Sequence, residues 1–332
     1  MTRVPALSIV IPCFNEEQTL PVCVESVAAY VASKPSGTVE VVLVDDGSTD
    51  GTWAVIQRIA AGRPHWSAIR FITNRGSHIA LRCACRYARG SRVVNLPVDL
   101  QEPVENIDKL LEAMNQQQAD AVLAVRRTRG DGWPERITSR TYNLVLHAVG
   151  LRNVPLEGTS QFLLTRPVVD QINAHDDRGF TFEGFLAVAP LKLAIVWYDR
   201  SAAMGRVSRW TVAAKIQHAL NTILSFSNAP IRGLSLMGAT VALVGLIYAA
   251  FVFIRFALFG GGSTGWPSLM TAVLVLGGLN LLALGLIGEY LWRILDETRR
   301  RPLYQIEDRF GIEPDEHVGV GIIAGDARRS GD

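Results

Sequence analysis

Residues 93–105 read VVNLPVDLQEPVE, and the rest of the chain is organised around this stretch. Its apolar run ends abruptly at Asp99 and Gln101, and Pro103 follows, which suits the end of a strand and the start of a helix. An open α/β sheet places its ligand at the carboxyl ends of its strands. The stretch therefore predicts an acidic ligand site. Pro97 stands two residues before Asp99, where a second carboxylate would be expected.

Apolar, β-branched runs alternate with helical patterns on both sides of this stretch. Strands are predicted at residues 7–12, 39–44, 67–72, 92–96, 119–125, 160–164 and 193–197. Helices are predicted at residues 15–31, 51–61, 77–88, 104–116, 137–149 and 183–189. This alternation predicts an α/β fold with a largely parallel, doubly wound sheet.

The composition indicates more than one structural unit. The chain has 332 residues, of which 48% are hydrophobic and 19% charged, and its net charge of +2 provides no basic field for nucleic acid. Residues 233–254 and 269–288 contain no charged side chain. Each segment is long enough to cross a bilayer as a helix, and two buried helices of a soluble protein are the alternative.

The charges around these two segments predict how they are oriented. Basic residues lie before the first segment and after the second, at Arg200, Arg206, Arg209, Lys215, Arg232, Arg293, Arg299, Arg300 and Arg301. The loop 259–268 between the segments is uncharged. The positive-inside rule therefore places both flanks in the cytoplasm, in a two-span protein of the cytoplasmic (inner) membrane.

Four regions follow from these patterns. We expect an α/β domain at 1–200, an interfacial segment at 201–232, a two-helix transmembrane hairpin at 233–292, and a cytoplasmic tail at 293–332. Residues 210–226 are amphipathic and are predicted to lie in the membrane interface. The end of the chain, from residue 305, is polar and Gly-rich, and is expected to be mobile.

Polar motifs follow three of the predicted strands, at residues 12–17 (PCFNEE), 45–48 (DDGS) and 99–102 (DLQE). Together they can hold a divalent cation, as a nucleotide diphosphate requires, or accept hydrogen bonds from a ribose or a base. The simpler interpretation is that each acid only caps, or offsets the dipole of, the helix that follows it.

Four segments of the chain resemble the inverting family-two glycosyltransferases, which have the GT-A fold. They are SIVIPCFNEEQTL, VVLVDDGSTDGT, VNLPVDLQEPVENI and LIGEYLWRILDETRRRPLY, and within the family they look like the polyprenyl-phosphate branch. The resemblance implies a GT-A catalytic domain at 1–200. It also implies transfer of one sugar from a nucleotide sugar to a polyprenyl phosphate, of the undecaprenyl type, at the cytoplasmic face of the membrane.

The resemblance also implies roles for individual residues. The residues carried over to the nucleotide are Pro12, Phe14, Glu16, Val44 and Asp46. Those carried over to Mg²⁺ or Mn²⁺ and the diphosphate are Asp99 and Gln101. The catalytic and phosphate-binding candidates are Asp99, Arg126, Arg206 and Arg209. The implied partners are the nucleotide-sugar donor, the polyprenyl phosphate and the lipid bilayer, without nucleic acid.

Two positions depart from the family pattern. The family usually has Asp-x-Asp-Leu-Gln at the strand end, where this chain has Pro97, and Gly-Asp-Phe-Arg where this chain has Ser160-Gln161-Phe162 after Thr159. With fewer carboxylates, the site is expected to bind Mg²⁺ or Mn²⁺ more weakly. Arg126, Arg127 and Arg129 could partly replace the metal charge, or could form a solvated basic loop.

Three functions are therefore considered. The first is an active polyprenyl-phosphate glycosyltransferase with an altered metal site, and the second is a catalytically impaired relative that acts as a binding partner or scaffold. The third is a processive polysaccharide synthase, which resembles the domain but carries more spans and a Gln-x-x-Arg-Trp element in place of Arg206-x-x-Arg209-Trp210. A homo-oligomer is also considered, because Gly277, Gly278, Gly285 and Gly288 permit close helix approach.

Overall fold

The strands of the structure, a computed structural model, form one mixed sheet. The structure describes residues 4–100, 102–126, 161–175, 180–198, 229–259, 265–299 and 302–312. Within these ranges the strands are β1 (Leu7–Cys13), β2 (Val39–Asp45), β3 (Trp66–Phe71), β4 (Arg92–Asn95), β5 (Ala121–Arg126), β6 (Gln161–Thr165), β7 (Leu193–Tyr198) and β8 (Ile306–Phe310). Their spatial order is β7-β5-β6-β4-β1-β2-β3-β8.

The sheet is parallel except at two strands. β6 runs antiparallel to both of its neighbours, β4 and β5, and β8 runs antiparallel to β3. The predicted largely parallel sheet is confirmed for the other strands. The direction of β6 was not predicted, because a short apolar run has the same pattern in either direction.

The prediction of a mobile tail from residue 305 is wrong for residues 306–310, which form β8. After the two long helices the chain returns to the sheet and pairs with β3, and the Ile72 amide donates to the Gln305 carbonyl over 3.0 Å. Tyr304 stacks on Phe71 with ring centroids 4.8 Å apart. This pairing covers the edge of β3, which would otherwise expose unpaired backbone groups.

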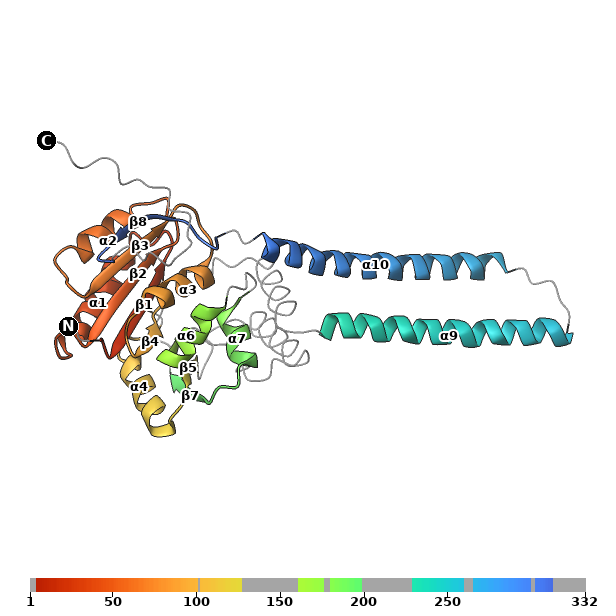
Figure 1. The fold of residues 1–332 in the computed structure, drawn as a ribbon, viewed down its shortest axis with the longest axis horizontal. Coiled ribbons are helices and arrows are strands. Elements are labelled where there is room, and N and C mark those ends of the chain that lie inside the picture. Colours follow the sequence, from red (N-terminus) through yellow and green to blue (C-terminus); the bar gives the residue numbers. More distant parts are fainter. Residues whose placement is uncertain are drawn as a thin grey trace.

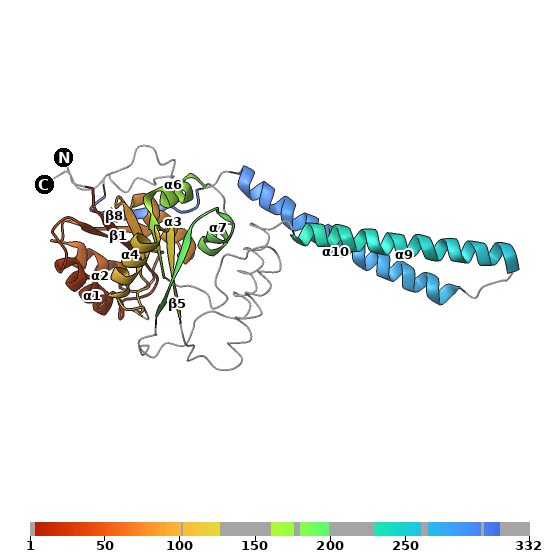
Figure 2. The same ribbon diagram turned by 90° about the horizontal axis from the view of Figure 1, so that it is seen from below.

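Helices cover both faces of the sheet (Figures 1 and 2). One core cluster includes side chains from α1 (Leu20–Ala32), α2 (Thr52–Ala60) and α4 (Asn106–Gln117). The other includes side chains from α3 (Ser77–Tyr87), α6 (Arg166–Ala174) and α7 (Phe182–Val188). The domain is therefore a three-layer α/β/α sandwich, as the GT-A expectation requires.

The first helix begins later than predicted, at Leu20 instead of residue 15. Asn15 has a φ of 54°, in the left-handed region, which is incompatible with a right-handed helix. Its amide donates to the Ser48 hydroxyl over 2.9 Å, and its own side chain accepts from the Thr49 amide. These bonds make residues 14–17 a loop at the sheet edge.

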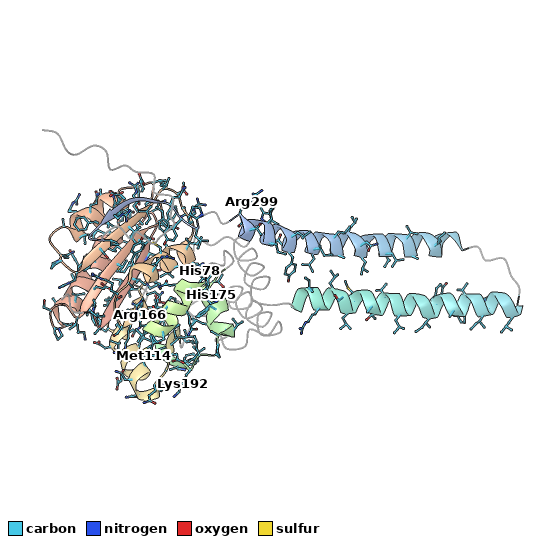
Figure 3. The ribbon with its side chains drawn as sticks, in the orientation of Figure 1. His78, Met114, Arg166, His175, Lys192 and Arg299 are labelled. Atoms are coloured by element: carbon cyan, nitrogen blue, oxygen red, sulfur yellow. The ribbon has the colours of Figure 1, made fainter. Side chains whose placement is uncertain are left out.

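Two long helices, α9 (Ala229–Phe259) and α10 (Trp266–Thr298), run side by side away from the sheet (Figures 1 and 2). Arg299 marks the end of α10 that lies nearest the domain (Figure 3). Segments Ile231–Val252 and Val275–Asp296 are long and apolar enough to cross a membrane, with mean hydropathies of 2.0 and 1.5. The described helices therefore agree with the predicted hairpin, although both extend beyond 233–292.

Several predicted features lie outside the described residues. They are the helix at 137–149, the interfacial helix at 210–226, residues 260–264 of the loop 259–268, and the chain beyond residue 312.

Candidate functional site

The ends of β1, β2 and β4 bring three predicted motifs to one edge of the sheet. β1 lies between β2 and β4, and Cys13 at the end of β1 is paired in register with Asp45 at the end of β2. Beyond β4, the Leu96 amide still donates to the Val10 carbonyl over 2.9 Å, which carries the chain toward Asp99 along β1. The loops that follow these strands therefore start from adjacent positions.

The first two loops are joined by hydrogen bonds. The Glu16 amide donates to the Thr52 hydroxyl over 2.8 Å, and the Glu17 amide donates to Asp50 over 3.3 Å. In return, the Gly51 amide donates to a Glu17 carboxylate oxygen over 3.1 Å. The loop after β1 and the loop after β2 are thus one structural unit, in which neither can move independently.

Asp46 has the best-defined surroundings of the predicted nucleotide-binding residues. It is 3% exposed, and its two carboxylate oxygens accept from the amides of Arg75 over 2.7 Å and Gly76 over 2.8 Å. Burial raises the pKa of Asp46 to about 6, against the lowering effect of these two hydrogen bonds, while the charge of Asp45 raises it further. Asp46 therefore fixes the loop that follows β3.

Gly47 allows this contact because of its backbone. Its φ is +68°, and a Cβ at this position would lie 2.6 Å from the carbonyl carbon of Thr73 and 2.8 Å from the Asn74 amide nitrogen. Both neighbours are backbone atoms, so the two loops could not approach this closely with any other residue.

Asp45 lies behind the edge, completely buried. Its carboxylate accepts from the Ser48 amide over 3.0 Å, and the Arg70 Nε lies 3.5 Å from its other oxygen. Burial raises the pKa of Asp45, and the Ser48 hydrogen bonds and the Arg70 charge act in the opposite direction. Asp45 supports the edge from inside the fold, whereas Asp46 is the acid joined to the neighbouring loop.

The charges of Glu16 and Asp99 both act on the Cys23 thiol of α1. Burial is the main cause that raises the pKa of the Cys23 thiol to about 12, and the charges of Asp99 and Glu16 add to it. Cys23 is buried inside the fold, and is a neighbour of the site without being exposed at it.

The structure describes one of the two predicted metal ligands. Asp99 is half-buried, and the turn that contains it has Leu100 at a φ of 47°. Gln101 lies outside the described residues. Among the residues that are described, no group of three or more His, Cys, Asp and Glu could hold a metal ion. Asp99 thus offers one carboxylate, which fits a cation only if a bound diphosphate and water complete its shell.

The other predicted residues have different surroundings. Phe14 is 37% exposed and Pro12 is half-buried, so both are accessible at the edge. Val44 is completely buried, and its side chain packs in the core beside α3, where only its backbone could contact a ligand. Arg126 ends β5, although its side chain is not described. Arg206, Arg209 and Ser160 lie outside the described residues.

A buried contact joins the segment before α4 to strand β7. The Tyr198 hydroxyl donates to a Glu102 carboxylate oxygen over 2.5 Å, and both side chains are at most 3% exposed. Glu102, the second acid of the DLQE motif, is therefore a structural partner of β7. Sequence spacing did not distinguish this role from ligand binding.

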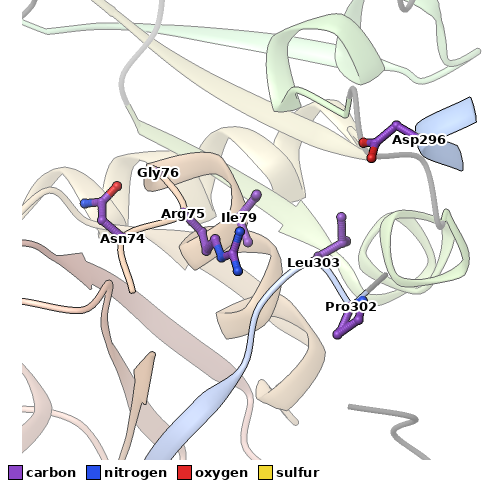
Figure 4. Close-up of a pocket in the computed structure, with 7 residues that line it drawn as sticks. All are labelled: Asn74, Arg75, Gly76, Ile79, Asp296, Pro302 and Leu303. Carbon is purple, nitrogen blue, oxygen red and sulfur yellow. The ribbon is translucent and has the colours of Figure 1, made fainter. Parts of the chain in front are cut away.

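A cleft of about 440 Å³ beside the loop that donates to Asp46 was not predicted (Figure 4). The loop after β3 and the start of α3 form one side, with Asn74, Arg75, Gly76 and Ile79, and the end of α10 and the residues that follow it form the other, with Asp296, Pro302 and Leu303. The sequence signal was the polar Asn-Arg-Gly run directly after a predicted strand. The second side could not be predicted, because it depends on the return of the chain to the sheet.

The sequence is similar to those of known glycosyltransferases. The profile of glycosyl transferase family 2 matches residues 8–175. A bactoprenol glucosyl transferase of Shigella phage SfX is 33% identical over 91% of this chain and 99% of its own length. A prophage bactoprenol glucosyl transferase homolog of Escherichia coli K12 is 33% identical, over 91% of this chain and 98% of its own. An uncharacterized glycosyltransferase of Synechocystis is 32% identical over 92% of this chain and 96% of its own length.

Among solved structures, the mannosyltransferase PcManGT of Pyrobaculum calidifontis, in complex with GDP-Man and Mn²⁺, aligns with this chain. It is 19% identical and covers 85% of this chain and 84% of its own, with a TM-score of 0.48. The assignment rests on the sequence matches, which extend over nearly the whole chain. The chain belongs to glycosyl transferase family 2.

Proposed function

We propose that the protein transfers a single sugar, with inversion, from a nucleotide sugar to a polyprenyl phosphate at the cytoplasmic face of the membrane. The observation that carries the proposal is the combination, in one chain, of a family 2 domain with two helices long and apolar enough to cross a membrane. Relatives named bactoprenol glucosyl transferase, matched over almost their whole length, support a polyprenyl acceptor.

The nucleotide of the donor binds at the joined loops after β1 and β2. Pro12, Phe14 and Glu16 come from the first loop, and Asp46 from the second. Asp46 is ionised at neutral pH and can accept from the base or ribose in addition to the two amides that it already holds. Because hydrogen bonds fix both loops before the donor arrives, little conformational entropy is lost on binding.

Asp99 and Gln101 would hold Mg²⁺ or Mn²⁺ against the diphosphate. The cation would supply positive charge that stabilises the leaving nucleoside diphosphate. With Pro97 at the position of a second acid, the protein contributes less negative charge, and the donor oxygens contribute relatively more. Arg126, at the end of β5, is the proposed source of a guanidinium for this region.

The acceptor needs positioning more than activation. A phosphate oxygen is already anionic at pH 7, so the transfer does not depend on a strong general base. Arg206 and Arg209 are the proposed ligands of the acceptor phosphate, and the two-helix hairpin would hold the domain at the membrane surface where the lipid phosphate lies. Oligomerisation through the glycines of α10 is a further part of the proposal.

Membranes that contain the full chain provide the test. Radiolabelled UDP-sugars and GDP-sugars are supplied with undecaprenyl phosphate and Mn²⁺, and lipid-bound label is measured. We expect label in the lipid with at least one donor, and a large loss of it in Asp99→Asn. An absence of transfer with every common donor would contradict the proposed activity.

A second function is favoured by the incomplete acidic site. Pro97 removes one expected carboxylate, and the described residues contain no cluster of three metal-ligating side chains. A relative without turnover would bind nucleotide or lipid and act as a partner or scaffold. Nucleotide binding without transfer in the same assay would favour this alternative, whereas robust transfer would exclude it.

A further inference from the structure

Arg70 of β3 connects three groups from different parts of the chain. Its Nε lies 3.2 Å from a carboxylate oxygen of Glu307 in β8 and 3.5 Å from one of Asp45 in β2. Its Nη2 donates to the Ser48 carbonyl over 3.4 Å. The side chain is 27% exposed, whereas that of Asp45 is completely buried. One guanidinium thus links the C-terminal strand to the support of the nucleotide-binding loops.

This link reaches the proposed donor site in two short steps. Asp45 accepts from the Ser48 amide, and the Ser48 hydroxyl accepts from the Asn15 amide over 2.9 Å. A change in the position of Arg70 would therefore move the loop after β2 and, through Ser48, the loop after β1. Because both loops are proposed to surround the nucleotide, such a movement would weaken donor binding and leave the rate of the chemical step unchanged.

The neighbouring acid of β8 has a different partner. Asp308 accepts from the Trp53 Nε1 and the Gln57 Nε2 of α2, over 3.2 Å each. These contacts fasten β8 to a helix and do not include Asp45 or Ser48. β8 therefore carries one acid that contacts the support of the donor loops and one that only docks the strand.

The residues before β8 approach the same site from the other side. Pro302 and Leu303 line the cleft opposite Arg75 and Gly76 (Figure 4). The amides of Arg75 and Gly76 donate to Asp46. The C-terminal segment therefore borders the surroundings of both Asp45 and Asp46, and it begins where α10 ends.

We propose that Arg70 is a positioning residue for donor binding, and that the C-terminal strand β8 acts on the nucleotide site through it. The inference rests on the donor site proposed above, and adds to it a contribution from the segment that follows the two apolar helices. The hairpin and the donor site are then coupled through covalent continuity from α10 to β8, and through the contact from Glu307 to Arg70.

Two single substitutions in β8 distinguish an effect on donor binding, through Glu307, from an effect on the attachment of β8 to α2, through Asp308. The full chain is purified with its helices, and the Kd for UDP and for GDP with Mn²⁺ is measured together with Tm. Glu307→Gln should raise the Kd of the bound nucleotide about threefold, the size expected for a partly exposed ion pair. The donor KM should rise by the same factor while kcat stays the same. Asp308→Asn, the matched control, should lower Tm and leave Kd unchanged.

A double-substitution cycle then tests whether the effect passes through Arg70. Arg70→Met should raise Kd about tenfold or more, because it leaves Asp45 buried without its cation. In that background Glu307→Gln should have no further effect on Kd. An equal effect of Glu307→Gln in both backgrounds, or equal Kd values for Glu307→Gln and Asp308→Asn, would overturn the inference. If Arg70→Met does not fold, Arg70→Lys takes its place and should weaken the Glu307→Gln effect.

Amide hydrogen exchange keeps this result separate from the proposed function. Glu307→Gln should speed exchange at residues 46–52 at least threefold relative to Asp308→Asn, with no nucleotide present. A wild type that binds neither nucleotide would contradict the donor site, and faster exchange would then still support the coupling of β8 to these loops. Unchanged exchange at 46–52 in Glu307→Gln would overturn the coupling even in an active enzyme.

Discussion

At the scale of single residues, Asp46 combines a buried carboxylate with a fixed loop. Its pKa of about 6 lies above the usual value for aspartate because burial disfavours the charge. The unfolded chain releases this proton at lower pH than the folded chain does. The contribution of Asp46 to stability is therefore greatest below about pH 4 and is lost as the pH rises through 6. The ionised form needed at neutral pH is held at a cost to folding.

This pKa predicts an acidic limb in the activity profile. Below pH 6 a protonated Asp46 is a poorer acceptor for the amides of Arg75 and Gly76 and for a donor, so kcat/KM for the donor should fall about tenfold per pH unit. Asp46→Asn should lower kcat/KM at pH 7.5 and remove the limb. The measurement is the pH profile from 5 to 8. A limb near pH 6 that persists in Asp46→Asn would assign it to another group.

Pro97 stands where the sequence analysis expects a second carboxylate. It is half-buried, and its carbonyl accepts from the Leu100 amide over 3.3 Å in the turn that carries Asp99. Pro97→Asp adds a hard anionic ligand near Asp99, and should lower the Mn²⁺ concentration for half-maximal activity about tenfold.

Pro97→Ala is the control for this substitution, because it removes the ring without adding a charge. Titration of activity with Mn²⁺ in both variants separates the two effects. An equal gain in Pro97→Ala would show that relief from the proline ring, and not an added ligand, is responsible.

At the scale of elements, the loop at Gly47 determines how closely β2 and β3 bring their ends together. Gly47→Ala places a Cβ 2.6 Å from the Thr73 carbonyl carbon at a φ of +68°. Gly62→Ala has a similar φ of +84° but no atom within 4 Å of its Cβ. Both variants should lose about 1 kcal/mol from the left-handed backbone, and Gly47→Ala should lose about 2 kcal/mol more from the displaced loop.

Thermal unfolding and nucleotide binding together check this prediction. Only Gly47→Ala should also weaken binding of UDP or GDP, since it moves the loop that holds Asp46. Equal losses of stability in the two variants would mean that the added Cβ at residue 47 does not displace the Thr73 backbone, and would contradict the prediction.

Most strands were predictable from sequence to within a residue or two, for a physical reason. VVLV of β2 and SIVI of β1 are buried on both faces, so their residues are continuously apolar and β-branched. β8 reads IEDRF, and only Ile306 in it is buried, so its pattern is that of a polar tail. Its place depends on the exposed edge of β3, which no local pattern describes.

The site was partly predictable in the same way. The acids at the strand ends follow from their position after apolar runs, which located Asp46 and Asp99. The burial of Val44, the pairing of Glu102 with Tyr198, and the contact of Arg70 with Asp45 depend on strand register and on neighbours distant in the chain. Local spacing contains no information about these.

At the scale of the whole molecule, the hairpin of α9 and α10 begins and ends next to the α/β domain. α10 ends near the domain, and β8 returns to β3, so both ends of the hairpin lie at the domain (Figure 1). This arrangement requires the domain and the end of the hairpin to be on the same side of any membrane that the helices cross.

Cysteine labelling in intact cells tests the orientation. The background is low, because Cys13, Cys23, Cys83 and Cys85 are all buried. A Ser263→Cys variant, in the loop between the helices, should react with a membrane-impermeant maleimide from outside. An Arg309→Cys variant, in β8, should react only after the cells are opened. Outside labelling of Arg309→Cys would reverse the proposed topology.

The central claim is that one sugar is transferred to a lipid phosphate. The most direct measurement is the mass of the lipid product made by the purified full chain from undecaprenyl phosphate and its nucleotide-sugar donor. We predict a lipid heavier by one sugar residue, with the anomeric configuration opposite to that of the donor by NMR. A lipid of unchanged mass, or one that carries several sugars, would contradict the account.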